Sequence, residues 1–172
     1  MPSAVFDGQR LKSGASFFLS IMNPIVNILP DERVLLDVSV SGKKRLLEEA
    51  ARLFAQTLNL DAQKIFENLW AREQLGSTGL GQGVAIPHGR IKGLREAAGA
   101  FVRLATPVEF DAPDKKPVSL VFVLLASEQD SETSLQILAA LATCFAERAF
   151  REDLTSAPDA PAARALFANV SA

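Results

Sequence analysis

One short segment, GSTGLGQGVAIPHGR (76–90), concentrates the residues of this 172-residue chain that could do chemistry. It contains five of the ten glycines and the only histidine, His88, which stands between Pro87 and Gly89. Glycine-dense loops can expose backbone N–H groups that bind an anion, but they also suit tight turns between short strands. The spacing fits neither a Walker A loop nor a dinucleotide-binding G-x-G-x-x-G fingerprint. The glycines alone therefore leave both roles open.

A single histidine restricts the chemistry to what one imidazole can do. Metal binding is not expected, because the chain has no second histidine and only one cysteine, Cys144. A serine or cysteine triad is not supported either, since no G-x-S-x-G elbow is present. If a backbone carbonyl holds one ring N–H, the other ring nitrogen presents a lone pair and can act as a nucleophile. His88 is therefore a candidate nucleophile, with an ordinary structural histidine as the alternative.

A phosphoryl group on His88 would need cationic and hydrogen-bonding partners, because phosphoryl transfer depends mainly on positioning and charge stabilisation. Arg72 closes the helix expected before the loop and can supply a guanidinium fork. An ordinary solvated arginine at a helix end is the alternative for this residue. Ser77 and Thr78 add two hydroxyl groups in the loop itself.

The composition excludes several classes of function. Hydrophobic residues make up 48% and charged residues 22% of the chain, which is ordinary for a globular protein. The formal charge of −2 and the lack of a dense basic stripe argue against nucleic acid as a partner. No apolar run reaches the roughly 18 residues of a membrane span, so membrane insertion is not expected. The lone Cys144 fits the reducing cytoplasm, and it is expected to pack as a small hydrophobic residue.

Helices and strands are expected to alternate along the chain and to form a single α/β domain with helices on both faces of a central sheet. The apolar run 118–126 predicts a strand buried on both faces. Ser41 and Asp61 are expected to cap the N-termini of two helices. The expected strands are 34–40, 84–86, 97–105 and 118–126, and the expected helices are 42–60, 61–73, 127–150 and 159–170. Residues 1–24 are expected to form a flexible or loosely docked extension before a domain at 25–172.

The segment REQLGSTGLGQGVAIPHGR (72–90) resembles the phosphorylation-site signature of the mannitol/fructose-type IIA components of the bacterial phosphotransferase system. The resemblance covers roughly residues 25–170 and includes ATPVEFDAPDKKPVSLVFVLLA (105–126). It implies an α/β/α sandwich with a mixed central sheet and no cofactor. It also implies that His88 becomes a phosphohistidine at Nε2, that Arg72 holds the phosphoryl group and that the loop 77–83 shapes the pocket. The loop residues that the resemblance assigns to the phosphoryl pocket are Ser77, Thr78, Gly79, Gly81 and Gly83.

One position departs from the pattern of this family. Many members carry a second histidine at the start of the helix that follows the long apolar strand, and the matching position here is Ser134. A serine can donate a neutral hydrogen bond, but it cannot supply a titratable positive charge. Ser134 is therefore expected to support the phosphoryl pocket without the charge of a histidine.

Within the family, LGSTG and PHGR most resemble the nitrogen-regulatory subgroup. That resemblance implies a cytoplasmic phosphocarrier that takes a phosphoryl group from an HPr-like carrier. Its phosphorylation state would regulate target proteins, such as kinases or potassium transport proteins. One alternative is a sugar-transport component that passes the group to a IIB cysteine of a fructose/mannitol-type permease. Another is a binding module that is never phosphorylated. Leu80 and Val84 could form an apolar rim that meets the carrier, or could pack in the core.

Overall fold

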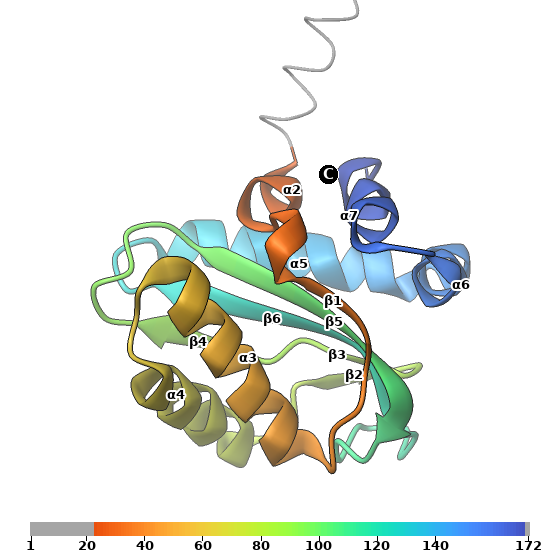
Figure 1. The fold of residues 1–172 in the computed structure, drawn as a ribbon, viewed down its shortest axis with the longest axis horizontal. Coiled ribbons are helices and arrows are strands. Elements are labelled where there is room, and N and C mark those ends of the chain that lie inside the picture. The colour runs from red at the N-terminus through yellow and green to blue at the C-terminus, as the bar shows by residue number, and fades with distance from the viewer. Residues whose placement is uncertain (1–22, 171–172) are drawn as a thin grey trace, which may run out of the picture.

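The long apolar run of the sequence becomes the central strand of a mixed, six-stranded sheet in the computed structural model, which describes residues 23–170 (Figure 1). The central strand, β6, pairs antiparallel with β5 and parallel with β3 and β4. Outside these, β1 pairs parallel with β5, and β2 pairs antiparallel with β3. The strands are β1 (Val34–Val38), β2 (Gly79–Gly81), β3 (Val84–Ala85), β4 (His88–Ile91), β5 (Ala98–Val108) and β6 (Val118–Ser127).

Helices cover both faces of this sheet (Figure 1). They are α2 (Pro24–Ile28), α3 (Lys43–Leu58), α4 (Ala62–Leu75), α5 (Ser131–Ala146), α6 (Arg148–Ser156) and α7 (Ala160–Ala168), with a 3-10 turn η1 (Asp31–Arg33). The helices α3 and α4 pack on one face, and α2, α5, α6 and α7 pack on the other. The predicted α/β/α sandwich with a mixed sheet is confirmed. No helix in residues 23–170 is long and apolar enough to cross a membrane.

The two hydrophobic cores explain why β6 is apolar at almost every position. Successive side chains of a strand point to opposite faces of the sheet. Val121, Val123 and Leu125 accordingly belong to the core under α3 and α4. Phe122 and Leu124 belong to the core under α5, α6 and α7. The prediction of a strand buried on both faces is confirmed, and the strand holds the two helical layers together.

The helix expected at 127–150 is two helices. The chain leaves the helical conformation at Glu147, whose φ and ψ are −78° and 120°, and α6 starts at the next residue. The guanidinium of Arg151 donates to the carbonyl oxygens of Phe145 and Ala146, at 2.7 and 3.0 Å. A cation at these carbonyls satisfies acceptors that have no partner within the helix. A tertiary contact thus stabilises the end of α5, and the helical periodicity contains no sign of it.

Other expected boundaries moved by a few residues. The expected cap at Ser41 is wrong, because Gly42 is the N-cap residue of α3 and no side chain caps this helix, whereas the cap at Asp61 is confirmed. The short elements α2, β2 and β4 were not predicted, since they lack a full period of pattern. Of the expected extension, residues 1–22 lie outside the described residues. The amide of Asn23 donates to the carbonyl oxygens of Phe167 and Ala168, which joins α2 to the end of α7.

Candidate functional site

His88 lies where one edge of the sheet resumes after a break. The strands β3 and β4 both pair with β6, but the residues between them do not continue a regular ladder. The backbone N–H of Ile86 donates to Thr78 instead, at 3.0 Å, and Pro87 has no N–H to donate. The carbonyl of Pro87 still accepts from the N–H of Leu124, at 2.9 Å. These two hydrogen bonds therefore hold the backbone just before His88, whose side chain is half-buried.

The imidazole of His88 is held in one tautomer. Its Nδ1 lies 2.8 Å from the carbonyl oxygen of Ile86. Because a carbonyl oxygen can only accept, Nδ1 carries the hydrogen and Nε2 is left with a lone pair. Burial lowers the pKa of His88 below its usual 6.5, and Arg72 lowers it further, while the Ile86 carbonyl and Glu73 act in the opposite direction. His88 is therefore neutral near pH 7, with Nε2 as the nucleophilic atom.

A hollow of about 530 Å³ lies beside His88, between α4, β4 and α5. Arg72 and Ser134 line this hollow together with His88, so the structure brings these three predicted residues together. The guanidinium of Arg72 donates to the carbonyl oxygen of Gly76, at 2.9 Å, which holds the half-buried side chain at the end of α4. The hollow can hold a small anion between a guanidinium group and a neutral imidazole.

The glycine-dense loop forms a tight hairpin and does not line the hollow. The turn between β2 and β3 has positive φ at both central residues, 57° at Gln82 and 78° at Gly83. This is the pattern of a two-residue hairpin turn, which favours glycine. The carboxylate of Asp114 accepts from the N–H of Gln82, at 2.8 Å. A Cβ on Gly79 would come within 2.8 Å of the Cβ of Ala112. Turns and close packing account for these glycines, including Gly81 beside Asp114.

The two loop hydroxyl groups donate hydrogen bonds elsewhere in the fold. Ser77 Oγ donates to the carbonyl oxygen of Phe110. Thr78 Oγ1 donates to the carboxylate of Glu73, at 2.6 Å, and the Thr78 N–H donates to the same group, at 3.1 Å. In this structure Ser77, Thr78, Gly79, Gly81 and Gly83 are thus part of the scaffold behind His88, and none of them lines the hollow.

Two positioning residues had no role in the sequence analysis. Glu73 is fully buried and binds Thr78 and the ammonium group of Lys43, at 3.2 Å. Asn68 Nδ2 donates to the carbonyl oxygen of Arg90, at 2.6 Å, and ties α4 to β4. A Cβ on Gly89 would collide with the Asn68 side chain, so the glycine permits this close approach. The helical spacing of Asn68, Arg72 and Leu75 was the available signal, because these residues share one face of a helix.

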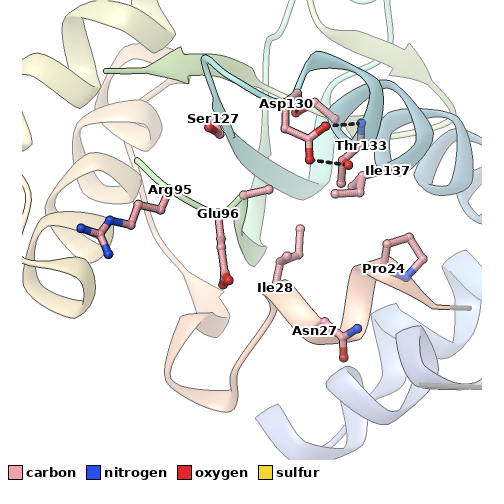
Figure 2. Close-up of a pocket in the computed structure, with 11 residues that line it drawn as sticks. Pro24, Asn27, Ile28, Arg95, Glu96, Ser127, Asp130, Thr133 and Ile137 are labelled. Carbon is pink, nitrogen blue, oxygen red and sulfur yellow. Dashed lines mark hydrogen bonds between the residues drawn. The ribbon is translucent and has the colours of Figure 1, made fainter. Parts of the chain in front are cut away.

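Ser134 stands at the buried start of α5, between two hollows. Its hydroxyl donates to the carbonyl oxygen of Asp130, at 3.1 Å, in the first turn of the helix. On its other side lies a hollow of about 250 Å³ between α2, the segment just before β5, and α5. Figure 2 shows this second hollow, with the carboxylate of Asp130 bonded to Thr133. The Ser134 hydroxyl thus bonds within the first turn of α5, and the residue brings no charge to the His88 hollow.

Exposed leucines surround the mouth of the His88 hollow. Leu75 and Leu135 line it and have 85% and 65% of their surface exposed. Of the two residues expected at a rim, Val84 is fully buried in the core, and Leu80 is 46% exposed but does not line the hollow. Cys144 is buried, as expected, and burial raises the pKa of its thiol to about 11.

Comparison with known proteins places the chain in a family. The model of the family described as "Phosphoenolpyruvate-dependent sugar phosphotransferase system, EIIA 2" matches residues 27–170. The chain belongs to this family. This IIA protein is 46% identical over 144 residues to a "Nitrogen regulatory protein" of Pseudomonas aeruginosa, covering 83% of this chain and 94% of that protein. The predicted family and its nitrogen-regulatory resemblance are confirmed, and membership identifies the chain as a phosphocarrier of the phosphotransferase system.

Solved structures agree with this assignment. The IIA-Ntr protein of Neisseria meningitidis is 50% identical, covers 83% of this chain and 98% of its own, and superposes with a TM-score of 0.80. The mannitol IIA protein of Escherichia coli is 18% identical and superposes with a TM-score of 0.68 over 80% of this chain and 97% of its own. The second likeness shows that the fold is shared.

Proposed function

We propose that this IIA protein is a cytoplasmic nitrogen-regulatory phosphocarrier that accepts a phosphoryl group on His88. The observation that carries the proposal is the hydrogen bond from His88 Nδ1 to the Ile86 carbonyl, which leaves Nε2 unprotonated and able to act as the nucleophile. Nε2 attacks the phosphorus of a phosphohistidine on an HPr-like carrier. A new N–P bond forms at His88, the N–P bond on the carrier breaks, and the carrier histidine leaves with the electron pair. Arg72, in the same hollow, binds the phosphoryl oxygens during transfer.

The exposed leucines supply a docking surface for the carrier. Leu75 and Leu135 lie on two different helices at the mouth of the hollow. Apolar groups that encircle a buried polar centre exclude water when two proteins meet. The carrier would cover both leucines and bring its phosphohistidine over His88.

Regulation would follow from the charge that phosphorylation adds. A phosphoryl group brings about two negative charges to one spot on the surface. A target protein that reads this spot would bind one of the two states more tightly. The relatives named as nitrogen regulatory proteins support the nitrogen branch for this chain.

The proposal is tested by intact-protein mass spectrometry after incubation with phosphoenolpyruvate, enzyme I and each HPr-like carrier. We expect one acid-labile phosphoryl group, acquired faster with the nitrogen-branch carrier. His88→Ala abolishes it, and Arg72→Ala slows its uptake strongly, whereas Arg52→Ala, at an exposed position on α3, leaves the rate unchanged. Faster uptake with the sugar-branch carrier and onward transfer to a IIB cysteine would favour the sugar-transport alternative. No uptake with any carrier would leave a binding module.

A further inference from the structure

A second arginine faces the same hollow as His88. Arg90 follows His88 by two residues in β4, and side chains two apart in a strand lie on one face of the sheet. Both residues line the hollow together with Arg72, which approaches from α4. The PHGR segment thus provides a guanidinium group beside the nucleophile, from the same strand.

The charged side chains that line the hollow complement an anion with two negative charges. Arg72 and Arg90 are the only charged groups among the residues described as lining it, and no carboxylate is present there. A phosphoryl group carries about two negative charges near pH 7. Ser134 on the opposite wall is neutral, and its hydroxyl hydrogen is donated to Asp130. The two arginines are therefore the full positive charges that the hollow offers to such an anion.

The two arginines differ in how they are held. Arg72 is half-buried and is fixed by its bond to Gly76. Arg90 is exposed, and its guanidinium takes part in no hydrogen bond or ion pair within residues 23–170. Its backbone, in contrast, is fixed by the 2.6 Å bond from Asn68 to its carbonyl oxygen. A fixed backbone with an uncommitted guanidinium suits a side chain that closes on an anion after the anion arrives.

We propose that Arg90 is a second phosphoryl-binding residue, which closes on the phosphorylated Nε2 of His88 and stabilises the phosphorylated state. The inference rests on the proposed function of His88. Arg72 is in place before transfer, whereas Arg90 adds its hydrogen bonds once the phosphoryl group is bound. Arg90 therefore acts mainly on the stability of the phosphorylated protein.

The test measures how a phosphoryl group distributes between the protein and its HPr-like carrier at equilibrium. The variants are Arg90→Gln, Arg90→Lys and, as a matched control, Lys92→Gln, which removes a charge from an exposed position just beyond β4. We expect Arg90→Gln to shift the distribution about tenfold toward the carrier, the effect of losing one charged hydrogen bond to phosphate. Arg90→Lys should recover part of the shift, and Lys92→Gln should stay within about twofold of wild type.

A second readout separates binding of the phosphoryl group from a general change of surface charge. Phosphorus-31 NMR reports the ionisation of the phosphoryl group on His88. Its last pKa should rise in Arg90→Gln and stay unchanged in Lys92→Gln, because a bound guanidinium favours the dianion. Equal distributions and equal phosphorus titrations in wild type and Arg90→Gln would overturn the role of Arg90 alone. A wild-type protein that takes up no phosphoryl group would overturn the proposed function itself.

Discussion

Glu73, next to Arg72, has a buried carboxylate that joins several parts of the scaffold behind the site. A single substitution that removes a partner of this carboxylate should therefore destabilise the fold strongly. The Glu73 side chain has no exposed surface. It accepts hydrogen bonds from Thr78 Oγ1 and from the Thr78 N–H, at 2.6 and 3.1 Å, and it pairs with Lys43 Nζ, at 3.2 Å. Lys43→Met removes the cation and leaves the carboxylate buried with only the bonds from Thr78.

The expected loss follows from the geometry of this pair. At 3.2 Å and an effective dielectric constant of about 20, the attraction between the two charges is about 5 kcal/mol. Breaking a buried pair lowers the free energy of unfolding by about 3–5 kcal/mol, because the remaining charge stays buried without compensation. Lys43 is 15% exposed and also contacts Asp111, and Thr78 still donates to Glu73. The loss should therefore lie at the lower end, at about 3 kcal/mol.

Urea unfolding followed by the fluorescence of the single tryptophan, Trp70, measures this loss. The matched control is Lys44→Met, which removes an exposed lysine whose Nζ lies 5.9 Å from the Trp70 ring, and it should lower stability by less than about 1 kcal/mol. In a Glu73→Gln background, Lys43→Met should also have an effect below about 1 kcal/mol, because a neutral amide needs no cation. Equal losses from Lys43→Met in the two backgrounds would mean that the Lys43–Glu73 pair does not stabilise the fold.

Three further predictions concern the groups around the site and in the core. NMR titration of the single imidazole should give His88 a pKa below 6.5, so its contribution to stability is complete above that pH and is lost as the pH falls. Gly89→Ala should lower the free energy of unfolding by about 1–3 kcal/mol, because the new Cβ meets Asn68, whereas Gly42→Ala, with open space around it, should change it by less than about 0.5 kcal/mol. Cys144, with a pKa of about 11, should react with iodoacetamide about a hundredfold more slowly in the folded protein than in urea.

Each of these three predictions has a result that would contradict it. A pKa of His88 above 6.5 would mean that burial and Arg72 do not dominate at the imidazole. Equal stability of Gly89→Ala and wild type in urea would mean that α4 and β4 do not approach as closely as the bond from Asn68 to Arg90 indicates. Equal rates of alkylation in folded and unfolded protein would mean that Cys144 is accessible.

Long periodic segments were predictable because their side chains face a core with a regular repeat. The apolar run of β6 and the stripe of α3 are of this kind, and both were located correctly. The break at Glu147 was not predictable, since a guanidinium from the next helix caps the preceding one. The two-residue strand β3 falls within the strand expected at 84–86, whereas the four-residue β4 is too short to show a period and exists because β6 provides a partner.

The residues of the site also differ in whether the local sequence could reveal their roles. His88 and Arg72 could be selected because their residue types and spacing match a known signature, and Ser134 because it stands where many family members have a second histidine; the structure brings all three to one hollow. Glu73 and the exposed Leu135 could not be given roles in this way. Their roles depend on which segment of the chain packs against them, and that information lies outside their own neighbourhood in the sequence.

In the proposed function, Nε2 of His88 carries the phosphoryl group. The most direct test is nitrogen-15 NMR of the imidazole of this single histidine, before and after incubation with phosphoenolpyruvate, enzyme I and the nitrogen-branch carrier. The structure predicts a hydrogen on Nδ1 and a bare Nε2 before transfer, and phosphorus coupled to Nε2 afterwards. Phosphorus on Nδ1, or an imidazole spectrum that the incubation leaves unchanged, would show that Nε2 does not accept the phosphoryl group.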